Sequence, residues 1–551
     1  MYNNLTMNNI LASKKIDISV GTNAAMLVET LLQQGVSSIF GYPGASVLSV
    51  YNELKKTNKI KHYLVRHEQA AVHAAEGYAR ISGKAGVVLV TSGPGFTNTI
   101  TGIANAYADS TPLVILAGDV PTTSKNHAKI FQNVDIGSMT KTCCKKTFII
   151  NSQSNIKSTI EEAFYTATTG IKGPVVVVLP RNILEAKFVA NRRSSFIIPK
   201  NNSNDFSKDI KKLTTLINNS KRPLLLIGGG CINSSEEIKA FVEKLKCPVV
   251  STLMGIGIFP SENNLYLGMI GQNGIKQANY AIRECDLLIC LGVAFSNRTT
   301  CKNTKFAPNA KIVNINITKT SQKVNLEILA DIKKFLAQFL KSDFKYNKDQ
   351  NDLSKISWLK NEENDTEFCN SKKLQSSLVL KTISEFTKSF EPIVVTDVGQ
   401  HQMLTAQFFN FNKPAKFITS GGMGTMGFGL PASIGAYIAN PNNLILNITG
   451  DGSFQMNLQE LATCREHNIP IKIIILNNGY LGMVRELQEK IYESRYQVEM
   501  TNPDFTKIAE AYDLFAVRVE TQNQLIPALE KAINHAGCAI IDISIDSFES
   551  I

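Results

Sequence analysis

Two groups of polar residues near the C-terminal end have the types and spacing of a phosphate and metal site. One apolar run, NLILNIT, ends in Gly450-Asp451-Gly452, and a second, IPIKIIIL, ends in Asn477-Asn478. Asp451 offers a carboxylate and Asn478 a carbonyl oxygen, both hard ligands suited to Mg²⁺. Glycines let the backbone approach a phosphate, and a helix starting near Ser453 favours anionic oxygens. The pattern predicts a site for a phosphate group and Mg²⁺, although G-D-G taken alone is equally typical of an ordinary turn.

Such residues share a site only if the fold brings the ends of their strands together. Short β-branched runs alternate with helical patterns along the chain, as in VVLVTSGPG, PLLLIGGG and PIVVTDVG. Continuous apolar strands bounded by glycine turns indicate parallel sheets covered by helices on both faces. In these sheets ligands bind beyond the carboxyl ends of the strands. We therefore predict α/β domains with doubly wound parallel sheets.

The 551 residues suffice for about three domains at ~100–200 residues each. Polar stretches rich in Asn, Asp and Lys divide the sequence. We predict a first domain at 1–190, a central domain at 191–345, a linker at 346–372 and a third domain at 373–551.

Composition narrows the class of protein. The net charge is +12, but no basic block with interleaved aromatic residues is present, so small anions are better candidate partners than nucleic acid. The ten cysteines form no C-x-x-C pair, which favours free thiols in a reducing compartment. No apolar stretch approaches the ~20 residues of a membrane span, and the first fifteen residues lack the apolar core of a secretory signal. We expect a cytoplasmic protein with no membrane partner, or one in an organelle stroma.

Longer stretches resemble the acetolactate synthase large-subunit family of thiamine-diphosphate enzymes. G-D-G followed by N-N resembles the cofactor fingerprint, and RHEQAAVHAAEGYAR, VTDVGQHQM and SGGMGTMGFGLPASIG resemble the family closely. The similarity runs over 18–519. It implies a pyrimidine-binding first domain, a central domain of the flavin-binding type, and a diphosphate-binding third domain. It also implies thiamine diphosphate, Mg²⁺ and at least a homodimer, since the cofactor lies between two chains, and leaves open a homotetramer and a small regulatory subunit.

The resemblance assigns roles around the cofactor. Glu68 would contact the aminopyrimidine ring and favour its imino tautomer, whose nitrogen takes the proton from the thiazolium carbon; a helix-start glutamate that only complements the dipole is the alternative. Met426 would support the bent conformation of the cofactor. The other cofactor contacts expected are Gln400, His401, Gly424, Gly452, Ser453 and Asn478. The metal ligands expected are Asp451, Asn478 and Tyr480.

The implied substrates are 2-keto acids: pyruvate is decarboxylated and its two-carbon unit joins a second keto acid, giving 2-acetolactate for branched-chain amino-acid synthesis. Gly44 would supply backbone near the reacting carbonyl. Lys145 would steer the pyruvate carboxylate, unless it is a solvated surface lysine. The remaining pocket residues expected are Phe131, Gln132, Met483 and Leu487. Gly44, Gln132 and Lys145 join Glu68 as the expected catalytic set.

Several positions depart from the family pattern. Glu486 and Leu487 occupy the Q-W positions, and Ala45 and Asn133 replace a Gly and a Glu near the chemistry. In the family, the tryptophan of the Q-W pair shapes the pocket for the acceptor. These changes therefore leave open a paralogous decarboxylase or carboligase that uses an aldehyde or keto sugar. An inactive regulatory partner is a third hypothesis, but it would not need the activating carboxylate.

The central domain lacks most polar residues of the flavin-binding pattern. Arg298 remains. The positions that differ are Asn273, Ala294, Ser296, Asn297, Asn316 and Thr318. Threonine accepts hydrogen bonds from a ribose less well than a carboxylate does. We therefore hypothesise weak or absent FAD binding.

Overall fold

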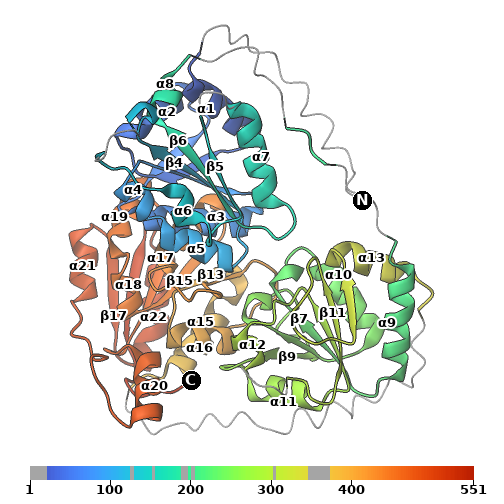
Figure 1. The fold of residues 1–551 in the computed structure, drawn as a ribbon. Helices are drawn as coiled ribbons and strands as arrows, with labels where there is room; N and C mark the ends of the chain where they lie inside the picture. The colour runs from blue at the N-terminus through green and yellow to red at the C-terminus, as the bar shows by residue number, and fades with distance from the viewer. Residues whose placement is uncertain are drawn as a thin grey trace.

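The chain folds into three α/β units, each built on its own sheet (Figure 1). The computed structural model describes residues 21–124, 130–151, 155–187, 196–199, 205–301, 306–344 and 373–551. Each unit contains a six-stranded sheet whose paired strands are all parallel. The predicted fold class is therefore confirmed. The predicted linker at 346–372 lies outside the described residues.

The first sheet has the order β2-β1-β3-β4-β6-β5. Its strands are β1 (Ser38–Gly41), β2 (Lys61–Leu64), β3 (Gly86–Val90), β4 (Leu113–Asp119), β5 (Lys146–Ile149) and β6 (Pro174–Pro180). The helices are α1 (Asn23–Gln33), α2 (Leu48–Thr57), α3 (Glu68–Ser82), α4 (Pro94–Thr97), α5 (Ile100–Ala108), α6 (Ile136–Thr140), α7 (Ile156–Thr168) and α8 (Arg181–Glu185). β3, β4 and β6 are buried along their whole length because helices cover both faces of the sheet, as their unbroken apolar sequences predict.

The central sheet has the order β12-β11-β10-β7-β8-β9. Its strands are β7 (Pro223–Ile227), β8 (Val249–Ser251), β9 (Tyr266–Met269), β10 (Leu287–Leu291), β11 (Lys311–Asn316) and β12 (Leu326–Leu329). The helices are α9 (Ser207–Asn219), α10 (Ser235–Leu245), α11 (Lys276–Glu284), α12 (Asn297–Thr300) and α13 (Ile332–Lys341).

The third sheet has the order β14-β13-β15-β16-β18-β17. Its strands are β13 (Ile393–Thr396), β14 (Phe417–Ile418), β15 (Ile445–Gly450), β16 (Lys472–Asn477), β17 (Phe515–Val519) and β18 (Ala539–Ser544). The helices are α15 (Ser376–Thr387), α16 (Gln400–Phe408), α17 (Gly429–Ala439), α18 (Asp451–Gln455), α19 (Leu461–His467), α20 (Gly482–Tyr492), α21 (Phe505–Ala511) and α22 (Gln522–Asn534). In the described ranges of all three units, no helix has the length and apolar character to cross a membrane.

The first and third units pack together through α3 and α17, which Figure 1 shows at their junction. Small residues let the two helix backbones approach closely. A Cβ built on Gly77 would lie 1.9 Å from Ala432 O, and one on Gly435 would lie 1.7 Å from Ala74 O. Glycine at these two positions is therefore required by the close helix packing, which fixes the two outer domains relative to one another.

We expect Gly435→Ala to destabilise this junction, because the added methyl group must push α3 away from α17. Overpacking of this kind costs about 1–3 kcal/mol. The free energy of unfolding from urea titration measures the effect. Gly137→Ala in α6 is the matched control, since its added Cβ meets no atom closer than 3.5 Å. Equal stability of the two variants would contradict the expectation.

Candidate cofactor site

The carboxyl edge of the third sheet brings Asp451 and Asn478 together. β15 and β16 are neighbours with Gly450 opposite Leu476, so the residues that follow each strand emerge side by side. Asp451 begins α18 directly after β15, and its carboxylate accepts the backbone N–H of Gly479 at 3.0 Å. The predicted meeting of the two motifs therefore occurs at the strand edge.

The Asp451 carboxylate is 2% exposed and, within the described ranges, forms no ion pair with a basic side chain. Burial raises its pKa to about 6, although Asn502 donates to it at 2.6 Å and favours the charged form. The part of the chain that the structure describes contains no cluster of three His, Cys, Asp or Glu ligands. A cation at Asp451 would therefore complete its shell with amide, backbone, water or phosphate oxygens, which is the shell that Mg²⁺ has at diphosphates.

Asn478, Tyr480 and Gln400 form one connected group beside Asp451. Asn478 Oδ1 accepts the backbone N–H of Tyr480 at 2.9 Å, and its Nδ2 donates to Gln400 Oε1 at 3.1 Å. Gln400 also donates to Glu486. A Cβ on Gly482 would lie 1.8 Å from Gln400 Oε1, so this glycine is what leaves room for the amide.

His401 fits a role at an anion. It is buried in α16, and its Nε2 has no hydrogen-bond partner among the described residues. Burial lowers the pKa of its imidazole to about 3, which keeps the ring neutral. An anionic oxygen beside Nε2 would raise that pKa and give the orphaned nitrogen a partner. This buried, unpaired atom is consistent with the predicted diphosphate contact.

Gly452 and Ser453 lie at the start of α18, next to the same edge. A Cβ on Gly452 would lie 3.0 Å from Leu481 Cδ2, so a side chain there would crowd the turn. Ser453 Oγ donates to Val398 O at 2.8 Å, which ties α18 to the turn before α16. Gly452 therefore leaves room in the turn, and Ser453 fixes the backbone at the predicted phosphate site.

Gly424 and Met426 lie in the loop between β14 and α17. Gly424 has a φ of +66°, which favours glycine. Asp397, a buried carboxylate after β13, accepts the backbone N–H groups of Gly427 at 2.8 Å and Gly429 at 3.1 Å. Burial raises the pKa of Asp397 to about 6. Asp397 was not among the predicted residues, although it carries the same signal as Asp451: a carboxylate directly after a buried strand.

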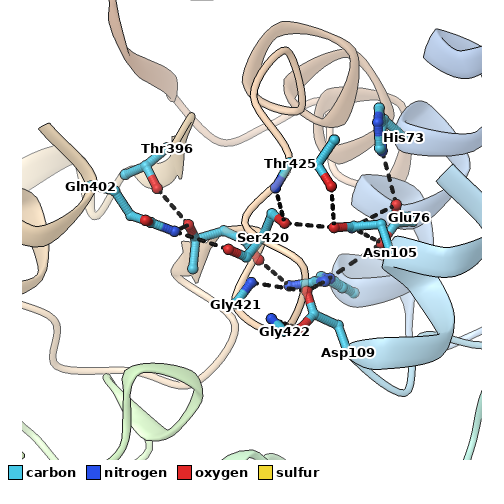
Figure 2. Close-up of polar contacts among 12 residues, drawn as sticks. His73, Glu76, Asn105, Asp109, Thr396, Gln402, Ser420, Gly421, Gly422 and Thr425 are labelled. Carbon is cyan, nitrogen blue, oxygen red and sulfur yellow. Dashed lines mark hydrogen bonds and ion pairs between the residues drawn. The ribbon is translucent and has the colours of Figure 1, made fainter. Parts of the chain in front are cut away.

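Figure 2 shows how the first domain fixes this loop. Asn105 Oδ1 accepts the hydroxyls of Ser420 at 2.5 Å and Thr425 at 2.9 Å. Asp109 accepts the backbone N–H of Gly422 at 2.6 Å. Both acceptors lie at α5 of the same chain, so the position of the loop that carries Met426 depends on the junction between the two domains.

The carboxyl edge of the first sheet gathers a second set of predicted residues. Glu68 is the first residue of α3, and its Oε2 accepts Asn98 Nδ2 at 2.9 Å. Gln132 Oε1 accepts the Ser92 hydroxyl at 3.4 Å, above the turn that follows β3. A Cβ on Gly44 would lie 2.4 Å from the Thr91 side chain, so only glycine fits beside this turn.

Two of the predicted pocket residues are not enclosed by the chain. Phe131 is 86% exposed, and Leu487 is 49% exposed. Met483 and Leu487 lie one turn apart on α20 and share a face. Among the described residues, no hydrogen bond or ion pair joins Glu68 to the group around Asp451. The two strand edges thus present separate halves of the predicted site.

The ammonium of Lys145 has hydrogen-bond partners within the chain. Its ammonium donates to Thr166 O at 2.5 Å and Thr169 O at 2.8 Å, at the C-terminal end of α7. The side chain therefore caps a helix in this structure, and its role in steering the pyruvate carboxylate stays a prediction. The sequence does not reveal this because the capped carbonyl groups lie more than twenty positions away, and only folding brings them close.

All three units match models of known protein families. The N-terminal thiamine pyrophosphate-binding domain model matches residues 22–139, the central domain model 210–339, and the C-terminal thiamine pyrophosphate-binding domain model 397–543. The acetolactate synthase large subunit of Buchnera aphidicola subsp. Schizaphis graminum is 40% identical over 96% of both chains. The isozyme 3 large subunit of Escherichia coli is 38% identical over 96% of both. The chloroplastic acetolactate synthase of Arabidopsis thaliana is 37% identical over 94% of this chain and 81% of its own. The chain belongs to the acetolactate synthase large-subunit family of thiamine pyrophosphate enzymes.

Proposed function

We propose that this chain decarboxylates pyruvate and joins the two-carbon unit to a second 2-keto acid, giving 2-acetolactate for branched-chain amino-acid synthesis. The observation that carries the proposal is the buried Asp451 carboxylate, which lacks a basic partner in the described ranges and lies beside the Asn478 turn in a chain of this family. Glu68 supplies the activating carboxylate of the proposed mechanism.

The proposed mechanism assigns each residue a task. Asp451 and Asn478 side-chain oxygens and the Tyr480 backbone would hold Mg²⁺, while Gln400 and His401 would bind the diphosphate. Glu68 would hold a proton at the aminopyrimidine ring and thereby favour the tautomer that acts as base. When bound, thiamine diphosphate supplies the electron sink for loss of carbon dioxide.

We propose further that two chains complete each site. The group at Asp451 lies at the edge of one sheet and Glu68 at the edge of another, and no hydrogen bond or ion pair joins them within the described part of one chain. A homodimer would place the first-domain edge of one chain against the third-domain edge of its partner. Light scattering on the purified protein measures the mass of the assembly, and so whether a homotetramer forms or a small regulatory subunit is bound.

The test is an assay of purified protein with pyruvate, thiamine diphosphate and Mg²⁺, with acetolactate measured after acid conversion to acetoin. Strong product formation supports the carboligase. Carbon dioxide release without acetolactate would instead favour an aldehyde or keto-sugar acceptor, the alternative to which Leu487 points.

We propose weak or absent FAD binding in the central domain. Two polar side chains at the altered positions are engaged locally: Ser296 caps α12, and Asn316 Nδ2 donates to Val293 O at 3.0 Å. Arg298 reaches Gln272 Oε1 at 3.3 Å. Stoichiometric flavin absorbance in the purified protein would contradict the proposal.

Leu487→Trp is expected to raise the preference for 2-ketobutyrate over pyruvate as acceptor. The half-exposed Leu487 lacks the aromatic ring with which a tryptophan would contact the extra methyl group of that acceptor. One methylene in an apolar pocket changes discrimination by about 10-fold or more. Product ratios from mixed substrates measure the preference. Leu378→Trp, at another half-exposed leucine, is the control. An unchanged ratio would show that Leu487 does not line the acceptor pocket.

A further inference from the structure

A carboxylate of the third domain, Glu460, holds the backbone that leads into Glu68. Glu460 lies in the short helix η7 (Leu458–Glu460) and is fully buried. Its Oε1 accepts the backbone N–H of Arg66 at 2.8 Å and that of His67 at 3.1 Å. These two residues come directly before Glu68, the first residue of α3. The third domain thus fixes the start of the helix that carries the proposed activating carboxylate.

A second side chain completes this contact. Thr463 Oγ1 donates to Glu460 Oε2 at 2.7 Å and lies 3.2 Å from Leu64 O, at the end of β2. Glu460 therefore binds two backbone groups of the segment 64–67, and the Thr463 hydroxyl that holds Glu460 lies against a third. A segment held at two adjacent N–H groups by a buried neighbour has little freedom to shift, and this limits where Glu68 can lie.

The buried carboxyl group of Glu460 is stabilised by the segment that it holds, although burial still raises its pKa to about 7. Burying a carboxylate is costly unless hydrogen bonds or a cation offset the lost hydration. In the described part of the chain Glu460 forms no ion pair, because the Arg66 guanidinium pairs with Glu466 at 2.6 Å instead. The two N–H groups beside the positive end of α3 supply the compensation. An apolar side chain at position 460 would leave both N–H groups without a partner.

We propose that Glu460 is a positioning residue for the reaction: through the backbone of residues 66 and 67 it sets the place of Glu68, without touching substrate or cofactor. The inference rests on the function proposed for Glu68. A displacement of about 1 Å in a catalytic group can cost on the order of 10²-fold in rate. Loss of the contact should therefore slow proton transfer at the cofactor more than it weakens cofactor binding.

The experiment uses the full chain loaded with thiamine diphosphate and Mg²⁺. The rate at which the thiazolium C2 proton of the bound cofactor exchanges with deuterium reports the action of Glu68 directly. Glu460→Ala is expected to lower this rate and kcat by about 10–100-fold, with unchanged cofactor Kd. Glu460→Gln keeps one acceptor oxygen for the two N–H groups and should recover most of the rate. A merely structural role would lower the thermal midpoint and the cofactor affinity together with the rate.

Glu466→Gln is the matched control, since Glu466 also reaches Arg66 but is 43% exposed and touches only its side chain. Its exchange rate should stay unchanged. Unchanged exchange in folded Glu460→Ala overturns the inference. If that variant does not fold, Thr463→Val, which removes the hydroxyl bound to Glu460 Oε2, takes its place, and unchanged exchange there overturns the inference. Normal exchange in Glu68→Gln would instead defeat the proposed function, whereas slow exchange there with normal exchange in Glu460→Ala would defeat the positioning role alone.

Discussion

Glu68→Gln is expected to lower kcat by about 10²–10⁴-fold, the range that a positioned acid or base contributes. Glutamine keeps an oxygen for Asn98 Nδ2, so the local fold should survive, but it cannot hold the proton that favours the imino tautomer. Deuterium exchange at the cofactor C2 and steady-state kcat measure the loss. Cofactor Kd should change little, because the substitution leaves the diphosphate and metal residues intact.

The control for this substitution is Glu185→Gln, at a glutamate whose side chain is 48% exposed and pairs with Arg181 on the surface. Its kcat should equal that of the unmodified chain, since exposed ion pairs contribute little. If Glu68→Gln also kept full activity and full exchange, Glu68 would be only a helix-start residue that complements the dipole of α3.

Asp451→Asn is expected to weaken Mg²⁺-dependent binding of thiamine diphosphate by at least about 100-fold, since even residues that only orient metal ligands contribute 10–100-fold. The amide occupies the same volume but removes the carboxylate charge of Asp451 beside the proposed ion. Isothermal titration calorimetry measures the affinity. Asp513→Asn, at a side chain that is 79% exposed, should bind the cofactor normally. Tight, Mg²⁺-dependent binding by Asp451→Asn would place the metal elsewhere.

The same carboxylate predicts a pH dependence. Metal binding requires the deprotonated ligand, and burial raises the pKa of Asp451 to about 6 in the absence of a cation. At pH 7 and above the carboxylate is ionised and affinity should be constant. Below about pH 6 a proton competes with the ion, so the apparent affinity should fall about tenfold per pH unit. This slope should be absent from Asp451→Asn, and a flat profile in the unmodified chain would contradict the ligand assignment.

Local sequence patterns predicted much of the candidate site. The apolar runs before Asp451 and Asn478 end at a glycine turn and an amide pair, and the structure makes them adjacent strands β15 and β16. Asp397 could have been found by the same reasoning. Glu460 could not, because its signal depends on the distant backbone of Arg66, and nothing in the sequence around LQEL indicates that contact.

The sequence by itself determined the three parallel-sheet units, the strand ends that carry Asp451 and Asn478, and the helix start at Glu68, because alternation of apolar runs, glycine turns and helical patterns is local. Only the tertiary structure decided which side chains these ends meet. It directed Lys145 to the carbonyl groups of α7 and brought Glu460 to the start of α3. Hydrogen bonds between residues hundreds of positions apart depend on how domains pack, and packing is a property of whole surfaces rather than of any short pattern.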